Sequence, residues 1–276
     1  MVVEWSSRRC LLCRREFDGR TFLCRECSDR HREGPVPASV RQQFYEALDR
    51  EHPARSNTYG SYNEPAGLLR AIDRLPRNAR ILELGSGGGH LGVTLASMGF
   101  TRITLSDFTT TTLTAIRERL PRLEVVSADA SSLPFEAGSF EAVITTDVIE
   151  HLPDVDEHLN EVSRVLISDG LYLVKTPNRL MADAYYKRRD MHDSYFWHPS
   201  MFSPGELRDT FYEHGFETRM IPAKRLTGAQ IAKLPGPAML RRVAGRLPLG
   251  WALVVLQPHL EVVAKKRRLS PHCAST

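Results

Sequence analysis

The sequence of 276 residues lacks a long hydrophobic run and a strong excess of either charge. A helix that spans a bilayer needs about 20 apolar residues, and the stretch from Trp251 to Leu256 is far shorter. The chain turns polar and basic after Met-Val-Val-Glu-Trp, so the apolar centre of a secretion signal is missing. The formal net charge of +4 is low for a protein that holds nucleic acid mainly by charge. We therefore expect a cytoplasmic globular protein without a transmembrane segment.

Cysteine is also scarce, except in the first 27 residues. Four of the five cysteines lie there, and Cys273 lies in a polar tail. The four form two C-x₂-C pairs with ten residues between them, namely Cys10, Cys13, Cys24 and Cys27. Four thiolates at this spacing suit tetrahedral zinc, whereas disulfides would require an oxidising compartment. We predict a structural zinc module over residues 1–33, similar to zinc ribbons and zinc knuckles, with His31 as an alternative to Cys27.

A linker and a helix separate the cysteines from the rest of the chain. The two prolines of Gly34-Pro35-Val36-Pro37 block regular structure. Apolar residues then recur at helical spacing from Ser39 to about Arg50. We assign residues 34–77 to this linker and an amino-terminal helical cap, and residues 78–276 to the second domain.

Short apolar runs alternate with helical patterns in the second domain. The predicted strands are 81–84, 103–105, 124–127, 142–145 and 171–175, with a terminal pair at 216–221 and 259–264. Strands separated by single helices imply a parallel sheet that is covered on both faces. Residues 178–202 are predicted to form an irregular aromatic lid, and residues 226–256 an insertion of helical character.

Two sequence patterns mark helix starts in this domain. Asp154 stands three residues before Glu157, as in a capping box. Ser203 is followed by Pro204 and Glu206, which combines a capping residue with proline at the first helical position. We expect helices to begin at both places.

A glycine-rich turn follows the first predicted strand. Gly85, Gly87 and Gly89 give the pattern G-x-G-x-G, whereas the dinucleotide fingerprint G-x-G-x-x-G would need glycine in place of His90. Backbone without side chains lets a cofactor approach closely, and the amino end of the following helix favours an anion. The turn therefore predicts a cofactor site.

Two acids follow the next strands of the same sheet. Asp107 comes after the second strand, where a carboxylate can accept hydrogen bonds from ribose hydroxyls. Asp129 and Ala130 come after the third strand, a suitable place for an acid that meets the exocyclic amine of adenine. Together with the glycine turn, these acids predict a pocket for an adenosyl group.

These motifs resemble the class I S-adenosylmethionine-dependent methyltransferases, in particular the type 11 enzymes of ubiquinone, sugar and secondary-metabolite biosynthesis. The resemblance runs from about residue 78 to 175 and includes Leu133–Phe135 and Asp147–Leu152. It implies a Rossmann-like α/β domain with a seven-stranded, mostly parallel sheet whose last strand is reversed. It also implies S-adenosylmethionine as cofactor and S-adenosylhomocysteine as product.

The resemblance further implies which residues hold the cofactor. Gly85 and Gly87 would lie beside the methionine portion, and a tyrosine that precedes the domain, Tyr59 or Tyr62, would close over it. The cofactor-binding candidates are Glu83, Gly85, Ser86, Gly87, Gly89, Asp107, Phe108, Asp129, Ala130, Asp147 and Tyr59.

Three histidines are candidates for the general base that a methyl acceptor with an O–H group requires. His151 follows the fourth strand, and His192 and His198 lie in the aromatic lid. His151 has a positioning role as its alternative. The lid suits a buried acceptor, and its alternative is a hydrophobic cluster beneath a long loop.

The acceptor predicted by this reasoning is a small-molecule or lipid-linked compound, with O-methylation ahead of C- or N-methylation. A first alternative is a ribosomal-RNA guanine-N methyltransferase whose zinc module grips RNA through arginines. These arginines would be Arg8, Arg9, Arg14, Arg15, Arg25 and Arg30. A second alternative is a non-catalytic interaction protein whose zinc module docks a partner.

The cysteine spacing generates a direct prediction. Purified protein should contain about one zinc per chain, because a module this small depends on its metal for folding free energy. Metal analysis after mild purification measures this stoichiometry. Protein that is folded and contains no zinc would contradict the prediction.

Overall fold

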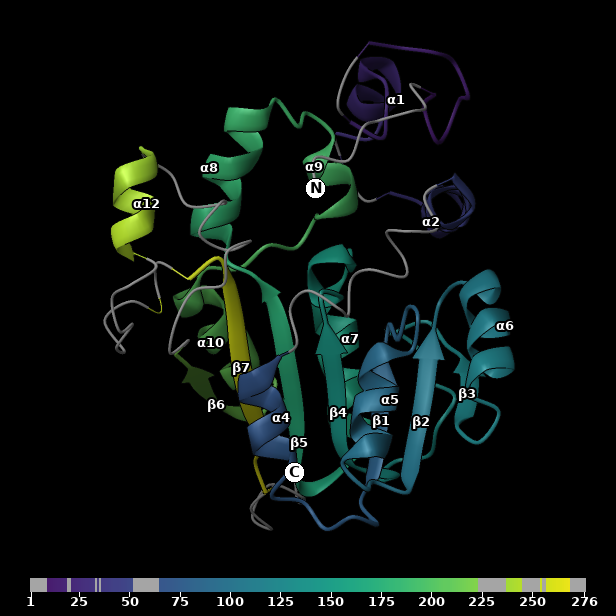
Figure 1. The fold of residues 1–276 in the computed structure, drawn as a ribbon, viewed down its shortest axis with the longest axis vertical. Helices are drawn as coiled ribbons and strands as arrows, with labels where there is room; N and C mark the ends of the chain where they lie inside the picture. The colour runs from purple at the N-terminus through teal and green to yellow at the C-terminus, as the bar shows by residue number, and fades with distance from the viewer. Residues whose placement is uncertain are drawn as a thin grey trace, which may run out of the picture.

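The computed structural model describes residues 9–18, 21–32, 34, 36–51, 65–222, 237–244, 254 and 257–268. At its centre is a seven-stranded sheet in the order β3-β2-β1-β4-β5-β7-β6 (Figure 1). The first five strands in this order pair in parallel, and β7 runs antiparallel to both of its neighbours. The predicted Rossmann-like sheet with a reversed last strand is thus confirmed.

The strands and helices alternate as the sequence pattern indicated. The strands are β1 (Arg80–Leu84), β2 (Arg102–Asp107), β3 (Glu124–Ser127), β4 (Phe140–Thr146), β5 (Leu166–Pro177), β6 (Phe216–Ile221) and β7 (His259–Lys266). The helices are α1 (Arg25–Arg30), α2 (Ala38–Glu51), α4 (Ala66–Ile72), α5 (His90–Ser97), α6 (Thr110–Arg119), the 3₁₀ helix η1 (Ile149–His151), α7 (Val155–Val165), α8 (Arg179–Arg189), α9 (Ser194–Trp197), α10 (Pro204–Glu213) and α12 (Ala238–Ala244). Within the described ranges, no helix has the length and hydropathy that a membrane crossing requires.

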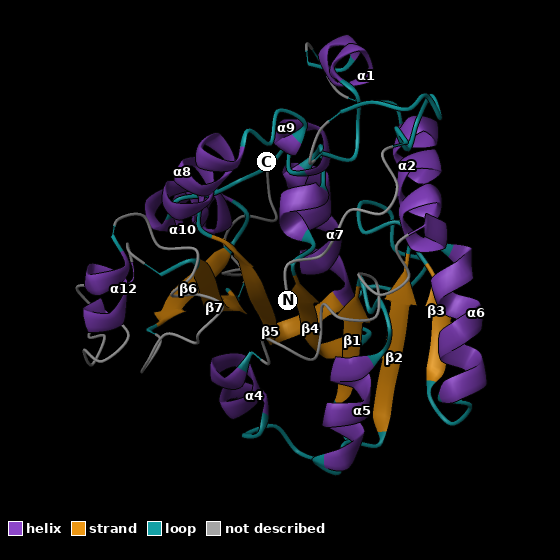
Figure 2. Cartoon of the chain, turned by 45° about the horizontal axis from the view of Figure 1, so that its top comes forward, coloured by secondary structure: helices purple, strands orange, loops and turns teal. Residues whose placement is uncertain are grey.

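Helices cover both faces of the sheet (Figure 2). Side chains from α4, α5 and α6 form one buried cluster with Ile81 of β1 and Leu173 of β5. Side chains from α7 and α10 form a second cluster with Leu82 of β1 and Tyr172 of β5. Adjacent residues of one strand therefore belong to opposite cores, which explains why these strands are apolar throughout.

Both predicted helix starts are present. The Asp154 side chain accepts a hydrogen bond from the Glu157 backbone N–H at 2.9 Å and caps α7. At the start of α10, Ser203 and Glu206 satisfy each other's backbone N–H groups, with Pro204 at the first position. These local contacts hold α7 and α10 at the face they cover.

The predicted irregular lid at residues 178–202 is wrong in its local structure. Most of this segment is helical, with α8 and α9 joined by a short turn. Asn178 caps α8 because its side chain accepts a hydrogen bond from the Leu180 N–H at 3.1 Å. Of the insertion predicted at 226–256, the structure describes α12 and Val254, and the remaining residues lie outside the described ranges.

The cysteine segment shares a third hydrophobic core with α2 and α9. Leu11 and Phe22 from the segment pack with Phe44 of α2 and Phe196 of α9, and all four are buried. The Asp193 carboxylate accepts hydrogen bonds from the backbone N–H groups of Phe22 and Leu23 at 2.7 and 3.1 Å. Figure 1 shows α1, α2 and α9 together above the carboxyl ends of the strands. The segment therefore covers the edge of the sheet where ligands bind in open α/β folds.

A buried chain of polar groups ties α7 to the sheet. The His158 Nδ1 atom lies 2.8 Å from the Ala130 carbonyl oxygen, which can only accept, so Nδ1 carries the proton. Nε2 then accepts from the Tyr172 hydroxyl at 2.7 Å, and that hydroxyl lies 2.9 Å from the Thr145 hydroxyl. Burial lowers the pKa of His158 to about 4, which agrees with a neutral ring. Each polar side-chain atom in this network of His158, Tyr172 and Thr145 has a hydrogen-bond partner.

We expect Tyr172→Phe to lower the free energy of unfolding by about 1–3 kcal/mol, because it keeps the ring and removes the partner of two buried polar atoms. Urea denaturation of the purified variant measures this change. Tyr212→Phe is the matched control, since the Tyr212 side chain is 59% exposed. Equal losses in the two variants would contradict the prediction.

Candidate functional site

The glycine turn after β1 has a conformation that other residues rarely adopt. Gly85, Gly87 and Gly89 have positive φ angles of 69°, 48° and 73°. A Cβ atom at position 85 would lie 2.4 Å from a methyl carbon of Val148, which follows β4. Glycine is thus required at Gly85 both by its backbone angles and by the close approach of the neighbouring strand end.

Asp107 ties the end of β2 to this turn. One carboxylate oxygen accepts a hydrogen bond from the Gly87 N–H at 2.9 Å. The other accepts from the backbone N–H and the hydroxyl of Thr109, both at 3.0 Å. A carboxylate has about four acceptor positions, so one remains for a ligand after these three bonds.

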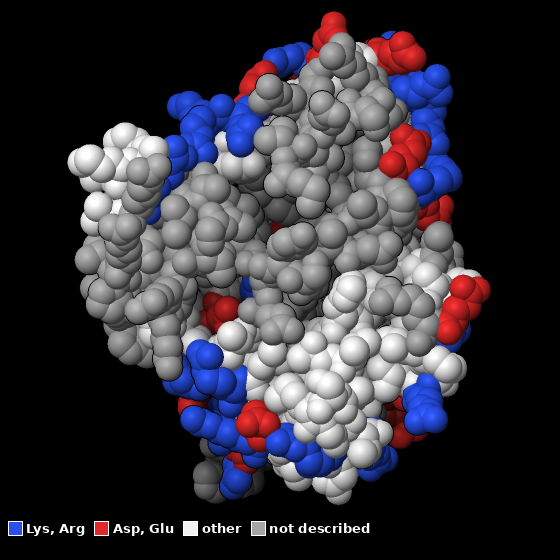
Figure 3. Space-filling view, in the orientation of Figure 1, with Lys and Arg blue, Asp and Glu red and all other residues white. Residues whose placement is uncertain are grey.

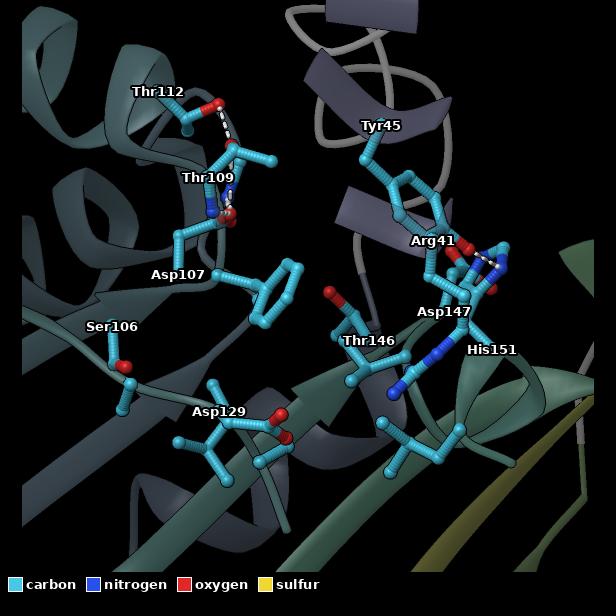
Figure 4. Close-up of a pocket in the computed structure, with 18 of the residues that line it drawn as sticks. Arg41, Tyr45, Ser106, Asp107, Thr109, Thr112, Asp129, Thr146, Asp147 and His151 are labelled. Atoms are coloured by element: carbon cyan, nitrogen blue, oxygen red, sulfur yellow. Dashed lines mark hydrogen bonds between the residues drawn. The ribbon is translucent and has the colours of Figure 1, made fainter. Parts of the chain in front are cut away.

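Asp129 follows β3 and lines the same cavity as the glycine turn. Its Oδ1 atom accepts a hydrogen bond from the Ser131 N–H at 2.9 Å, which holds the turn after β3. The adjacent Ala130 carbonyl is held by His158, so the buried polar chain described above also positions this turn. Figure 4 shows Asp107 and Asp129 on one side of the cavity.

The cavity has a volume of about 210 Å³ and lies at the carboxyl ends of β1, β2 and β4. It brings together most of the residues that the sequence predicted for cofactor and acceptor. The predicted residues that line it are Gly85, Gly87, Asp107, Phe108, Asp129, Ala130, Asp147 and His151. Of the other predictions, Tyr59 and Tyr62 lie outside the described residues.

Glu83, Ser86 and Gly89 lie beside the cavity and not in its described lining. Glu83 is buried in β1, where burial and, to a smaller extent, the nearby Asp107 carboxylate together raise the pKa of its carboxyl to about 8. The Ser86 N–H donates to the Ser106 carbonyl at 2.9 Å, and Gly89 is the N-cap of α5. These three residues belong to the strand, the turn and the start of the helix that together form the glycine turn, and they support its backbone.

The sequence predicted a helical cap within residues 34–77, but the side chains that α2 contributes to the cavity were missed. Arg41, Tyr45 and Leu48 line the cavity from one face of this helix. Figure 4 shows Arg41 and Tyr45 reaching toward the residues below them. Their spacing of four and three residues was the signal that could have identified them. Among the described residues, the tyrosine that lines the cavity is Tyr45 of α2.

A buried ion pair, also missed from the sequence, lies beside this cover. Lys175 of β5 donates to the Asp147 carboxylate at 2.7 Å, and both side chains are largely buried. Asp147 has a positive φ of 57°, and its N–H donates to the Lys175 carbonyl at 2.8 Å. A single lysine within an apolar strand was the available signal, because a buried charge needs a partner.

Of the three candidate histidines, His151 lines the cavity. Its Nδ1 atom donates to the Trp197 carbonyl oxygen, and the Tyr45 hydroxyl lies 2.9 Å from the same nitrogen. A carbonyl only accepts, so Nδ1 carries the proton and Nε2 carries the lone pair. Removal of the ring from water lowers the pKa of His151 to about 4.

His192 and His198 occupy different places and do not line the described cavity. The His192 Nε2 atom lies 3.1 Å from the Leu23 carbonyl oxygen, so this residue joins the cysteine segment to the turn before α9. The His198 Nδ1 atom lies 2.6 Å from the Tyr186 hydroxyl. The ring of His198 is 4.6 Å from the ring of His151, centroid to centroid.

The four paired cysteines come together as a second site. Their sulfur atoms lie within 4.8 Å of one another, and no disulfide joins them. His31 instead packs its ring against Phe196 at 5.7 Å and is not part of this group. Four thiols at these distances are compatible with structural zinc, which would leave no open coordination position.

Comparison with known proteins identifies the kind of domain in which this cavity lies. A family model described as a methyltransferase domain matches residues 82–174. A probable S-adenosylmethionine-dependent methyltransferase of Mycobacterium tuberculosis is 34% identical over 151 residues, which are 55% of this chain and 46% of that protein. The ubiquinone biosynthesis O-methyltransferase of Caulobacter sp. is 36% identical over 107 residues, which are 37% of this chain and 42% of that protein.

A solved structure shows the same fold. An S-adenosylmethionine-dependent methyltransferase of Thermotoga maritima has a TM-score of 0.58 at 18% identity, over 81% of this chain and 98% of that one. The chain spans about half the length of the curated relatives that it matches first.

The glycine turn gives a prediction for ligand binding. We expect Gly85→Ala to weaken the binding of S-adenosylhomocysteine at least about tenfold, because the new methyl group would displace Val148 and the turn with it. Isothermal titration calorimetry measures this change.

Gly138→Ala is the matched control for this variant. Gly138 has the same φ of 69° and no neighbour within 4 Å of a new Cβ atom. Both variants therefore carry the same backbone strain, and only Gly85→Ala adds the contact. Equal affinities in the two variants would show that the approach to Val148 does not shape the site.

Proposed function

Since this chain belongs to the class I S-adenosylmethionine-dependent methyltransferases, we propose that it transfers a methyl group to a hydroxyl of a small-molecule or lipid-linked acceptor. One observation carries the proposal. One cavity is lined by the glycine turn, Asp107, Asp129, Tyr45 and His151. Figure 4 shows the two aspartates on one side of it and Tyr45 and His151 on the other. The first side suits the adenosyl group and the second suits the acceptor.

The contacts on the first side support a role in cofactor binding. Asp107 is fixed by three hydrogen bonds and keeps one acceptor position for a ribose hydroxyl. The Asp129 carboxylate accepts a hydrogen bond from the Ser131 N–H and can also accept one from the adenine amine. Gly85 and Gly87 offer bare backbone to the methionine portion. The bound cofactor supplies an activated methyl group on a sulfonium.

The second side supports O-methylation. The acceptor oxygen forms a bond to the methyl carbon while the carbon–sulfur bond breaks and sulfur takes the electron pair, so the hydroxyl proton must leave. His151 lies in this wall with its tautomer fixed by the Trp197 carbonyl, which leaves the Nε2 lone pair for chemistry. This nitrogen can take the proton itself or bind a cation that lowers the pKa of the hydroxyl.

The arginines of the cysteine segment favour a small acceptor over RNA. Five of those considered for RNA pair with acids, as Arg9–Glu16, Arg14–Glu51, Arg15–Glu26, Arg25–Asp190 and Arg30–Glu26. Figure 3 shows acidic and basic side chains interspersed around this segment. Arginines that already pair with carboxylates lose those partners when they bind phosphate, which weakens the gain from RNA.

The domain division is part of the proposal. Residues 1–33 would form the zinc module, 34–77 the linker and helical cap, and 78–276 the methyltransferase domain. The shared core of Phe22, Phe44 and Phe196 supports a module that braces the cover of the cavity. In this arrangement residues 178–202 close the acceptor side, with the zinc module fixed against α9.

A labelled-methyl assay tests the proposed reaction. Protein incubated with deuteriomethyl S-adenosylmethionine and a panel of phenols, catechols and polyprenylated phenols should produce a methyl ether, detected by mass spectrometry. His151→Gln should lower kcat at least about 100-fold, because the acceptor proton loses its exit. The affinity for S-adenosylhomocysteine should change less than about threefold, which separates chemistry from binding.

His192→Gln is the control, since His192 contacts the Leu23 carbonyl and not the described cavity lining. Its kcat should stay within about threefold of wild type. Full activity in His151→Gln, or label on RNA or protein lysine instead of a hydroxyl, would refute O-methylation. The absence of S-adenosylhomocysteine binding would refute the enzyme assignment and favour a non-catalytic interaction protein.

A further inference from the structure

We propose that Glu150, His151 and His198 bind a divalent metal ion at the acceptor side of the cavity. One potential ligand atom from each residue lies within 4.8 Å of the other two. Two of the residues come from η1, directly after β4, and His198 comes from the end of α9. The role of this ion in methyl transfer rests on the proposed function, whereas its binding does not.

Hydrogen bonds hold the two segments together at this point. The Ser200 N–H donates to the Glu150 carbonyl at 3.1 Å. The Ser200 hydroxyl donates to the Leu152 carbonyl at 2.5 Å. With the bond from His151 to the Trp197 carbonyl, these contacts fix His198 above η1 before any ion binds. A site held in place in this way loses little conformational entropy on binding.

Glu150 supplies an independent indication of a ligand. Its side chain is completely buried, and Oε2 accepts a hydrogen bond from the Thr176 hydroxyl at 2.9 Å. Its Oε1 atom is buried and has no hydrogen-bond partner among the described residues. A buried carboxylate oxygen without a partner is costly. A cation at this oxygen would remove that cost.

The two histidines have the outer contacts that metal ligands usually have. Metal-bound histidine typically donates its second N–H to a carbonyl or carboxylate, which orients the ring. His151 donates Nδ1–H to the Trp197 carbonyl, so Nε2 is its ligand atom. The Tyr186 hydroxyl at 2.6 Å from Nδ1 orients the ring of His198 in a comparable way.

The ligand atoms of this site indicate which ions it would bind and how a bound ion would act on the acceptor hydroxyl. Two imidazoles and one carboxylate suit zinc, iron(II) or manganese(II) and leave coordination positions open. An acceptor hydroxyl at such a position would lose its proton to water, and the resulting oxygen would bond to the methyl carbon as the carbon–sulfur bond breaks. The cysteine site, with four thiolates, has no open position and would remain structural.

Manganese is a suitable probe because it prefers oxygen and nitrogen ligands to the thiolates of the cysteine site. Full-length protein, with its zinc content measured before and after treatment with EDTA, is titrated with Mn²⁺ and followed by electron paramagnetic resonance. We expect one bound Mn²⁺ per chain, with pulsed spectra that show coupling to histidine nitrogen. If excess Mn²⁺ produces no bound ion and no coupling to histidine nitrogen, the proposal is overturned.

Variants locate the ion. His198→Gln should weaken Mn²⁺ binding at least about 100-fold, and Glu150→Gln should do the same if it folds. His214→Gln is the control, because His214 caps the end of α10, where its Nδ1 donates to the Thr210 carbonyl at 2.8 Å and its Nε2 lies 3.4 Å from the Asp156 carboxylate. Circular dichroism of the His198→Gln variant, compared with wild type, tests whether the variant is folded. Mn²⁺ binding that is unchanged in a folded His198→Gln variant would overturn the proposed ligand set.

The last measurement separates this proposal from the proposed function. EDTA treatment should lower methyl transfer at least about tenfold, Mn²⁺ should restore it, and S-adenosylhomocysteine affinity should stay the same. Full methyl transfer in EDTA by protein that binds no Mn²⁺ would overturn the metal site and leave O-methylation standing. One bound Mn²⁺ in protein that does not bind S-adenosylhomocysteine would support the metal site and overturn the function.

Discussion

The close approach of the ends of β1 and β4 is the constraint on which the site depends. Gly85 and Val148 are so near that the structure leaves no room for a side chain at position 85. This approach places the glycine turn next to Asp147 and η1, so the two sides of the cavity face each other. Asp107 then locks the turn to β2 through the Gly87 N–H. A parallel sheet provides such an edge, because all of its carboxyl ends lie together.

The cover of the cavity depends on a second set of contacts. Phe44 of α2 meets Phe22 and Phe196 edge to face, with centroids 5.9 and 5.1 Å apart. Tyr45, the next residue of the helix, and Arg41, about one turn earlier, line the cavity. The aromatic core thus orients the helix whose other side chains contact the site, and the cysteine segment contributes to that core.

Much of this arrangement followed from sequence. The seven strands, the glycine turn and the cap at Ser203 depend on local patterns, namely apolar runs, G-x-G-x-G and residue spacing. The four cysteines were correctly predicted to form one cluster, because two C-x₂-C motifs are a characteristic spacing of metal ligands. Local signals therefore identified both the sheet and the cysteine site.

The missed features all require knowledge of contacts that are distant in sequence. Tyr45 reaches His151 across 106 residues, and Lys175 reaches Asp147 across 28. The aromatic residues of 178–202 suggested a loop. Instead, Phe196 is buried in the core formed with α2 and the cysteine segment, Tyr195 and Trp197 pack against that core, and most of the backbone is helical. His192 was a candidate base because its contact with the Leu23 carbonyl, 169 residues away in the sequence, could not be foreseen.

The contacts of the Asp193 carboxylate constrain how the sequence can evolve. It holds the Phe22 and Leu23 amides, while the neighbouring Trp197 holds His151 and packs against Phe22. Loss of the cysteine pairs would leave a buried acid and an unsupported tryptophan beside His151 and the cavity. The cysteines, Asp193 and Trp197 should therefore be inherited or lost together, as one co-varying unit among relatives.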